Sequence, residues 1–389
     1  MRKISDDAQR VEGQAMFKIL AHANELEARG RKILHFEIGE PDFATPDFIT
    51  AAGIKALDDG ETKYVNSLGI LDLRQAIQAY IDVNYGYHPD IGQILVCPGA
   101  NPVIYFVLKT VANPGDEIIV QDPGFPTYYS AIKYAGLKAV TVPLQEENEF
   151  RMNPQEIRNK ITKKTRLIIV NSPQNPTGAV MKQNEIKEIF NIAREYDLYL
   201  LSDEIYGKMT YDQSHHSATI YDQCKEHTIM LNGFSKSYAM TGWRLGYALG
   251  PVPVIEKMGL ILQTILSCVP PFVQRAGIAA LTGDQEIVSK MMEEFRRRRD
   301  LMLSGLNNLP GVKCIKPEGA FYLFPNIKGT GMTSEEFGRF MLTHAGVAVC
   351  PGNFFGPGGE GFARFSYASP LIEIEEALEK MSAALREKV

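Results

Sequence analysis

Short apolar runs alternate with amphipathic stretches from about residue 94 to residue 250, and this alternation constrains the fold more than any other feature. Between most of the runs lie helical patterns such as QNEIKEIFNIAREYD. Apolar strands that alternate with helices predict an α/β fold, with a mostly parallel seven-stranded sheet covered by helices on both faces. Ligands of such sheets bind at the carboxyl ends of the strands. The seven runs are ILVC (94–97), EIIVQ (117–121), KAVTVPL (138–144), RLIIVNS (166–172), LYLLSD (198–203), HTIMLN (227–232) and LGYALG (245–250).

The pattern changes after about residue 280. TGDQEIVSKMMEEFRRRRDLMLSGLNNL predicts one long helix, and the strand-like runs AFYLF, VAVC and FARFSYA precede a final helix. These elements predict a second, smaller α+β domain. The expected division is a large domain over 49–281, a small domain over 14–48 and 282–389, and an N-terminal arm over 1–13.

The long helix carries four consecutive arginines, Arg296 to Arg299. Glutamates stand four residues before two of them, so Glu293 with Arg297 and Glu294 with Arg298 form i,i+4 pairs. We therefore interpret the run as a solvated helix face rather than a site for an acidic partner.

Composition excludes several functional classes. The net charge is −5, which gives no indication of nucleic-acid binding. No apolar run approaches the roughly 18 residues of a membrane-spanning helix, and the N-terminal residues lack the apolar core of a secretory signal. The five cysteines form no C-x-x-C pair, and the histidines show no ligand spacing. We expect a cytoplasmic protein with reduced thiols, no metal, no nucleic acid and no membrane.

Two glycine-rich signatures of nucleotide binding are missing or misplaced. GPGGEG, at residues 356–361, fits G-x-G-x-x-G literally but precedes a strand-like run instead of a helix. We expect a loop there, and the chain has no P-loop motif.

Polar residues follow the ends of several predicted strands. In CPGANPVIY, Gly99 and Ala100 form a small turn, and Asn101 is expected to cap a helix whose free N–H groups can bind an anion. In VNSPQNPTGAV, Asn175 precedes a proline and is expected to be extended, with its amide above the sheet. Taken singly, a plain strand-to-helix turn and a loop-capping asparagine fit these residues as well.

Two further strand ends carry ionisable groups. Asp203 ends the run LYLLSD, with Tyr206 three residues later. A carboxylate there is costly unless it meets a cation or strong donors, although a helix N-cap is an alternative. Lys236 follows HTIMLNGFS, where desolvation lowers the pKa of an amine and frees it as a nucleophile, although a structural lysine is an alternative. Arg244 lies eight residues further on. An anion site, an amide, a carboxylate and a lysine together suit pyridoxal 5'-phosphate, a phosphorylated aromatic aldehyde held as a Schiff base.

The chain resembles the class I/II aminotransferases of PLP fold type I, in the aspartate aminotransferase-like branch. GFSKSYAMTGWRLG is similar to the cofactor-lysine signature of this family, and NSPQNPTG and SDEIYGK add to it. The resemblance runs from FEIGEPDFATP, near residue 40, to ARFSYASP, near residue 364. It implies transfer of an amino group from an L-amino acid to a 2-oxo acid by a ping-pong mechanism, with 2-oxoglutarate as the expected acceptor.

The resemblance also implies a role for each matching residue. Lys236 would bind the cofactor as a Schiff base and act as general base, and Asp203 would face the pyridine nitrogen. Tyr206 and Asn175 would donate to the phenolic oxygen. Arg364 would bind the substrate α-carboxylate, with Asn175 and Gly39 nearby. The phosphate would be held by Gly99, Ala100, Asn101, Ser235, Arg244 and, from the second subunit of a homodimer with shared active sites, Tyr64.

Some residues depart from the family pattern. Phe125 stands where the ring-stacking residue is commonly tryptophan or tyrosine, so stacking is kept without a polar ring atom. Gly233 stands where some relatives place a phosphate-binding serine. Met16 and Phe17 favour an apolar or aromatic donor, whereas Lys109 favours a dicarboxylate, and both alternatives stay open.

Three other functions compete with transamination. A β-lyase, decarboxylase or synthase of the same fold shares the first chemical steps. A sensor domain of a transcription regulator would need a basic DNA-binding module, for which this acidic chain leaves no room. A nicotinamide dehydrogenase would need a glycine-rich fingerprint between a strand and a helix.

Overall fold

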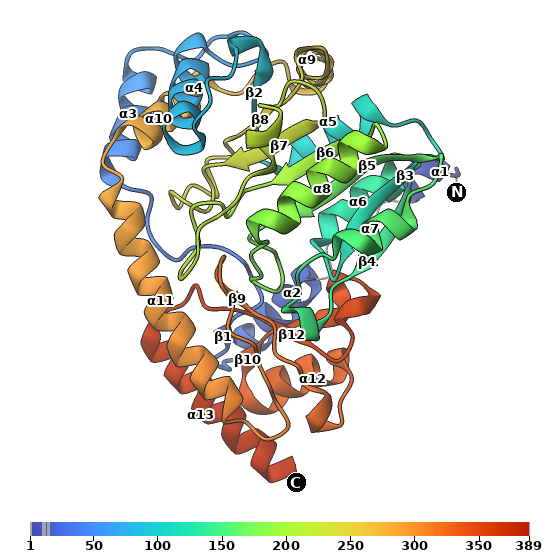
Figure 1. The fold of residues 1–389 in the computed structure, drawn as a ribbon. Coiled ribbons are helices and arrows are strands. Elements are labelled where there is room, and N and C mark those ends of the chain that lie inside the picture. The colour runs from blue at the N-terminus through green and yellow to red at the C-terminus, as the bar shows by residue number, and fades with distance from the viewer. Residues whose placement is uncertain (1, 10–12, 14–15, 389) are drawn as a thin grey trace.

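The structure, a computed structural model, describes residues 2–9, 13 and 16–388. Its centre is a seven-stranded sheet of order β2-β8-β7-β6-β5-β3-β4, in which β8 runs antiparallel to both of its neighbours (Figure 1). Each of the seven apolar runs forms one of these strands, so the predicted sheet is confirmed. The strands are β2 (Ile94–Cys97), β3 (Glu117–Asp122), β4 (Lys138–Pro143), β5 (Thr165–Asn171), β6 (Tyr199–Asp203), β7 (Thr228–Gly233) and β8 (Gly246–Leu249).

Helices cover both faces of this sheet, which is why its strands are apolar almost throughout. Ile168 of β5 packs in a core with α7 and α8, and the next residue, Ile169, packs in another core with α5, α6 and α9. A third core joins the sheet to α3, α4 and α10. These helices are α3 (Asp47–Asp58), α4 (Leu71–Tyr85), α5 (Asn101–Val111), α6 (Pro126–Tyr134), α7 (Pro154–Lys160), α8 (Gln183–Glu195), α9 (Val252–Leu266) and α10 (Pro271–Thr282).

Smaller sheets and long helices form the rest of the molecule around a core of their own (Figure 1). The long predicted helix is α11, and the final helix is α13, which packs against it. The predicted strand-like runs all contain strands. The division into two domains at the stated boundaries stays a prediction. The elements are α1 (Asp6–Gln9), α2 (Met16–Ala28), β1 (Leu34–His35), α11 (Glu286–Asn307), β9 (Tyr322–Leu323), α12 (Ser334–Phe340), β10 (Val347–Ala348), β11 (Cys350–Pro351), β12 (Ala363–Ser366) and α13 (Leu371–Lys388), with β1 paired to β10, and β12 between β11 and β9.

The arginine run on α11 differs from its prediction. Arg298 and Arg299 are 6% and 1% exposed, so the interpretation of the run as a solvated face is wrong for these two residues. The Glu294–Arg298 pair forms at 3.0 Å, whereas Arg297 contacts Glu294, three residues away, instead of Glu293. Buried arginines need partners, and tertiary contacts supply them here.

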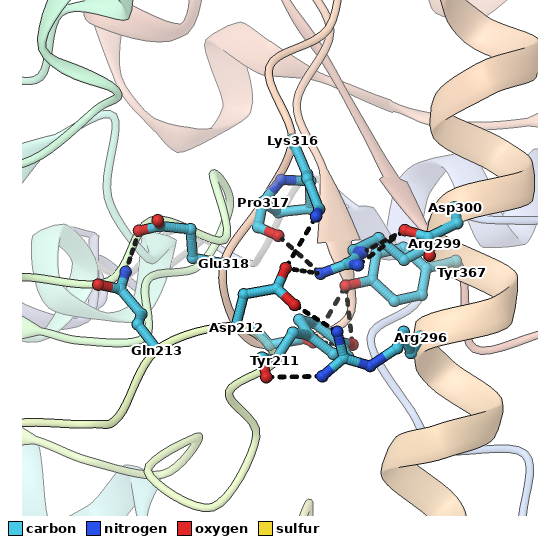
Figure 2. Close-up of polar contacts among 11 residues, drawn as sticks. Tyr211, Asp212, Gln213, Arg296, Arg299, Asp300, Lys316, Pro317, Glu318 and Tyr367 are labelled. Atoms are coloured by element: carbon cyan, nitrogen blue, oxygen red, sulfur yellow. Dashed lines mark hydrogen bonds and ion pairs between the residues drawn. The ribbon is translucent and has the colours of Figure 1, made fainter.

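The Asp212 carboxylate forms ion pairs with two arginines of this run and with one lysine. It accepts from Arg296, lies 3.3 Å from Nη1 of Arg299 and lies 2.8 Å from Nζ of Lys316. Figure 2 shows the Asp212 carboxylate among the Arg296, Arg299 and Lys316 side chains. The guanidinium carbon of Arg299 lies 4.4 Å from the centre of the Tyr211 ring. The cluster therefore ties the loop that follows β6 to α11 and to the segment before β9.

Other expectations of the sequence concern loops, thiols and membranes. GPGGEG forms a loop of short 3₁₀ turns before β12, as expected. The five cysteines are unpaired, and three of them are buried. Within the described part of the chain, no helix combines the length and apolar character needed to cross a bilayer, and no group of side chains is arranged to hold a metal ion.

Candidate active site

A cavity of about 210 Å³ lies where the parallel strands of the large sheet end. Asp203 is the last residue of β6, Lys236 follows β7, and Asn175 lies in the loop after β5. Of the site residues predicted from the sequence, all but Gly99 and Tyr64 line the cavity. The lining comprises Met16, Ile38, Gly39, Ala100, Asn101, Ile104, Phe125, Tyr128, Asn171, Asn175, Asp203, Ile205, Tyr206, Leu231, Ser235, Lys236, Thr241, Arg244, Tyr322 and Arg364.

The start of α5 forms one wall of the cavity. The cap residue is Ala100, and Asn101 is already the first helical residue, so the prediction of Asn101 as the N-cap is wrong. Gly99 adopts a φ of +85°, and a Cβ there would lie 2.4 Å from Arg244. Glycine thus lets the Arg244 guanidinium approach the free N–H groups of the helix, which favours an anion between them.

Asp203 is buried at the base of the cavity. Its Oδ2 accepts a hydrogen bond of 2.5 Å from the hydroxyl of Tyr128, and its Oδ1 accepts one of 3.1 Å from the backbone N–H of Ile205. Burial raises the pKa of the carboxyl to about 6, while these two donors act in the opposite direction. A buried carboxylate in this state gains most from a cationic partner.

Lys236 presents its amine to the same cavity. Its Nζ donates a hydrogen bond of 2.6 Å to the carbonyl oxygen of Gly39. Burial lowers the pKa of the amine to about 8; the charge of Glu40 opposes this shift, and the charges of Arg364 and Arg244 add to it. Near neutral pH the uncharged, nucleophilic form of the amine is therefore a larger fraction than for an ordinary lysine.

Arg364 lies in β12 and is 1% exposed. Its Nη1 donates to Oδ1 of Asn175 at 3.1 Å, and its Nη2 donates to the backbone carbonyl of Glu37. Its guanidinium carbon lies 4.6 Å from the centre of the Tyr322 ring. The buried Nε has no partner among the described residues. An unsatisfied guanidinium N–H at a cavity wall fits a planar carboxylate.

The residues present fit pyridoxal phosphate. A nucleophilic amine, a buried carboxylate without a cation, and a glycine-bordered helix start beside an arginine meet in one cavity, and each suits a different part of that molecule. The half-buried ring of Phe125 forms another wall.

Two aromatic residues that touch the site residues, Tyr128 and Tyr322, were not predicted from the sequence. Tyr128 follows Phe125 by three residues, so helical spacing gave a signal for it. The Tyr322 hydroxyl lies 2.7 Å from that of Tyr206, and a Cβ at Gly39 would lie 2.0 Å from it. Nothing in the local sequence around Tyr322 indicates this tertiary contact.

Other predicted residues lie away from the cavity. Tyr64 is 84% exposed. Lys109 lines a separate depression between α5 and α9 and is not among the residues that line the cavity, so the cavity gives no support to the dicarboxylate alternative. Met16 lines the cavity as expected, whereas the side chain of Phe17 lies outside the described residues. Gly233 is buried in β7, where a Cβ would lie 3.2 Å from Cα of Gly246, so close strand packing accounts for the missing serine.

Comparisons with known proteins agree with this chemistry. The family model for aminotransferase class I and II matches residues 31–381. An aspartate aminotransferase of Pyrococcus horikoshii is 41% identical, over 91% of this chain and 90% of its own length. Aromatic-amino-acid aminotransferase 2 of Thermococcus litoralis is 40% identical over 99% of both chains. The structure of aspartate aminotransferase from Thermus thermophilus with maleate superposes with a TM-score of 0.94 at 35% identity, covering 99% of this chain and 100% of that one. The chain belongs to the class I and II aminotransferases and is a pyridoxal-phosphate-dependent transaminase with the fold of that family.

Proposed function

We propose that the cavity around Lys236 moves an amino group from an L-amino acid to a 2-oxo acid, with 2-oxoglutarate as the acceptor. The observation that carries this proposal is the meeting of the Lys236 amine, the Asp203 carboxyl and the Arg364 guanidinium in one cavity. When bound, pyridoxal phosphate supplies an aldehyde that condenses with amines and a ring that accepts electrons.

Different residues of the cavity would bind different parts of the cofactor. The start of α5, Ser235 and Arg244 would bind the phosphate through N–H groups, a hydroxyl and a guanidinium. Phe125 would stack against the ring, and Asp203 would offer its negative charge to the ring nitrogen. Tyr206 and Asn175 would hydrogen-bond the phenolic oxygen. The tertiary contacts already described hold these groups in position before any ligand binds.

Lys236 and Arg364 act on the amino acid. Arg364 binds the α-carboxylate through a bidentate pair, with Asn175 and Gly39 beside it, and so orients the Cα–H bond. The amine of Lys236 would act as a general base that takes the proton from Cα of the donor and passes it on. The lowered pKa of Lys236 supports this role, because more of the amine is uncharged near neutral pH than for an ordinary lysine, while the amine stays basic enough to take a proton.

We propose further that donors with apolar or aromatic side chains are preferred. Met16, Ile38 and Ile104 line the cavity, and the cations among its lining residues are Lys236, Arg244 and Arg364. Each of these cations already has a role, so none is free for a side-chain carboxylate. One similar protein is named as an aromatic-amino-acid aminotransferase and another as an aspartate aminotransferase, so both donor classes occur among the relatives.

We propose further that the protein is a homodimer and that it is located in the cytoplasm. Large apolar side chains are exposed on α3 and α9, among them Ile54, Leu57, Leu260 and Ile265, which favours burial against a second copy. The exposed Tyr64 would then reach the phosphate in the cavity of that second copy. The unpaired cysteines favour a reducing compartment.

Two measurements test the function. Borohydride reduction followed by peptide mapping is expected to fix the cofactor on Lys236, and a label on another side chain would overturn the assignment. A single turnover with phenylalanine, tyrosine, aspartate or alanine and no acceptor is expected to yield one equivalent of 2-oxo acid per site. Continuous release of ammonia or carbon dioxide would identify a lyase or decarboxylase instead. The apolar-donor proposal fails if aspartate gives the highest kcat/KM.

A further inference from the structure

The first turn of α6 brings two aromatic rings to the cavity. Phe125 directly precedes the helix, and Tyr128 follows three residues later on the same side. Their ring centres lie 5.7 Å apart at an interplanar angle of 86°. Tyr128 is completely buried, so its ring cannot turn its hydroxyl toward solvent.

The hydroxyl of Tyr128 is committed to one acceptor, Oδ2 of Asp203, at 2.5 Å. The other carboxylate oxygen, Oδ1, accepts from the backbone N–H of Ile205 at 3.1 Å. With one donor on each oxygen the carboxylate cannot rotate freely. Lone pairs remain on both oxygens for a cation in the cavity, because a carboxylate has about four acceptor positions.

The other charges near Asp203 do not replace the phenol. Glu204 lies next in sequence, and its negative charge disfavours a second charge on Asp203. Burial acts in the same direction, so Tyr128 and the Ile205 N–H are the contacts that favour the ionised form. Removing the phenol would leave one oxygen of a buried carboxylate without its donor, which is costly.

We propose that Tyr128 is a positioning residue for the transamination reaction: its hydroxyl orients the Asp203 carboxylate and limits how strongly that carboxylate draws the proton from the ring nitrogen of the cofactor. This inference rests on the proposed role of Asp203 opposite that nitrogen. A carboxylate that keeps the phenol hydrogen bond is a weaker base, so the proton stays on the ring nitrogen and the ring keeps its positive charge. That charge is what makes the ring an electron acceptor.

Tyr128→Phe in the holoenzyme tests the proposal, with Tyr129→Phe as a matched control. Tyr129 is the next residue of the same helix, and its hydroxyl donates to the backbone carbonyl of Gln121 at 2.6 Å, without contact to Asp203. Both variants lose one phenol hydrogen bond, but only the first loses the bond to the carboxylate.

Three readouts separate positioning from a general effect on folding. Tyr128→Phe is expected to weaken cofactor binding and lower kcat, each by roughly tenfold, with the donor KM little changed because Arg364 is untouched. The pH midpoint of the visible absorption of the bound cofactor is expected to move to higher pH, because a less positive ring leaves the imine nitrogen more basic. Tyr129→Phe is expected to keep the wild-type midpoint and cofactor affinity.

A change in thermal stability without a change in midpoint or cofactor affinity would overturn the proposal. If Tyr128→Phe does not fold, Tyr128→His replaces it, since an imidazole N–H can donate to the same carboxylate. The pH midpoint of Tyr128→His is expected to lie between that of the wild type and that of an enzyme without the hydrogen bond to Asp203. A wild-type midpoint in a variant shown to lack this hydrogen bond would also overturn the proposal. Failure of the wild-type enzyme to bind pyridoxal phosphate on Lys236 would instead overturn the proposed function.

Discussion

The side-chain oxygen of Asn175 accepts a hydrogen bond of 3.1 Å from Nη1 of Arg364, across a sequence separation of 189 residues. Asn175 follows β5 of the large sheet, whereas Arg364 lies in β12 of the three-stranded sheet. Arg364 lines the cavity, and its buried Nε has no hydrogen-bond partner among the described residues. The carboxylate-binding group is therefore oriented by the loop that also supplies a cofactor-binding amide in our proposal.

Arg364→Lys is expected to lower kcat/KM for every amino donor by about 10- to 100-fold, because an ammonium cannot form the bidentate pair and one charged hydrogen bond is lost. Steady-state kinetics with several donors measure this effect. Arg339→Lys is the control, since Arg339 is exposed on α12 and remote from the lining residues. An unchanged kcat/KM in Arg364→Lys would remove Arg364 from substrate binding.

The capture of pyridoxal phosphate by the apoenzyme is expected to accelerate as the pH rises toward about 8 and to level off above it. The pKa of Lys236 is lowered by burial, so the uncharged amine predominates only above that value. Stopped-flow absorbance gives the rate at each pH.

Lys208→Met provides a matched control for this profile. Burial also lowers the pKa of Lys208 to about 8, but its amine contacts Tyr238 and Gln285 outside the cavity. The variant should keep the wild-type midpoint. If Lys208→Met shifted the midpoint, the pH profile would report the titration of Lys208 and not that of Lys236.

Asp212→Asn is expected to reduce stability by about 1 kcal/mol or less, because the carboxylate is 45% exposed and partly screened. Hydrogen bonds from Lys316 and Arg296 hold the pKa of this carboxyl well below its ordinary value. The stabilisation is therefore present above the unfolded-state pKa of about 4 and is lost as the pH falls below it. Melting curves of wild type and variant should converge in acid.

Glu286→Gln is the control for this prediction, because Glu286 forms an exposed i,i+4 ion pair with Lys290, and both residues lie on α11. Its melting temperature should equal that of the wild type. An equal effect of both substitutions would show that the Asp212 cluster contributes no more than an ordinary surface pair.

Ile265→Glu is expected to convert a dimer to a monomer and to weaken cofactor binding, because a charge would be buried in the proposed interface on α9. Sedimentation velocity gives the mass, and titration with pyridoxal phosphate gives the affinity. Ile372→Glu is the control, since Ile372 is similarly exposed but lies on α13. A wild type that sediments as a monomer would contradict the dimer directly.

The sequence predicted the large sheet well, and the reason is physical. A strand covered on both faces must be apolar at nearly every position, so β3 and β5 are continuous apolar runs whatever their neighbours are. The family resemblance then identified the residues at the strand ends, which lie together because parallel strands end at one edge.

Contacts between distant segments were not predictable in the same way. The burial of Arg299 depends on Asp212 and Tyr211, which no local pattern places beside it. The cap of α5 lies one residue earlier than the N-cap preferences of Asn101 indicated, because the turn at Gly99 sets where the helix begins.

Two groups of the proposed site belong to different sheets, since Lys236 follows β7 of the large sheet and Arg364 lies within β12 of the three-stranded sheet. Arg364 would hold the α-carboxylate and Lys236 would act at Cα, and the distance between these two groups is the same in every α-amino acid. A shift of one sheet relative to the other should therefore change the rate with all donors alike. Changes of donor preference should instead arise at residues such as Met16, Ile38 and Ile104, which line the cavity without contacting the common part of the substrate in our proposal.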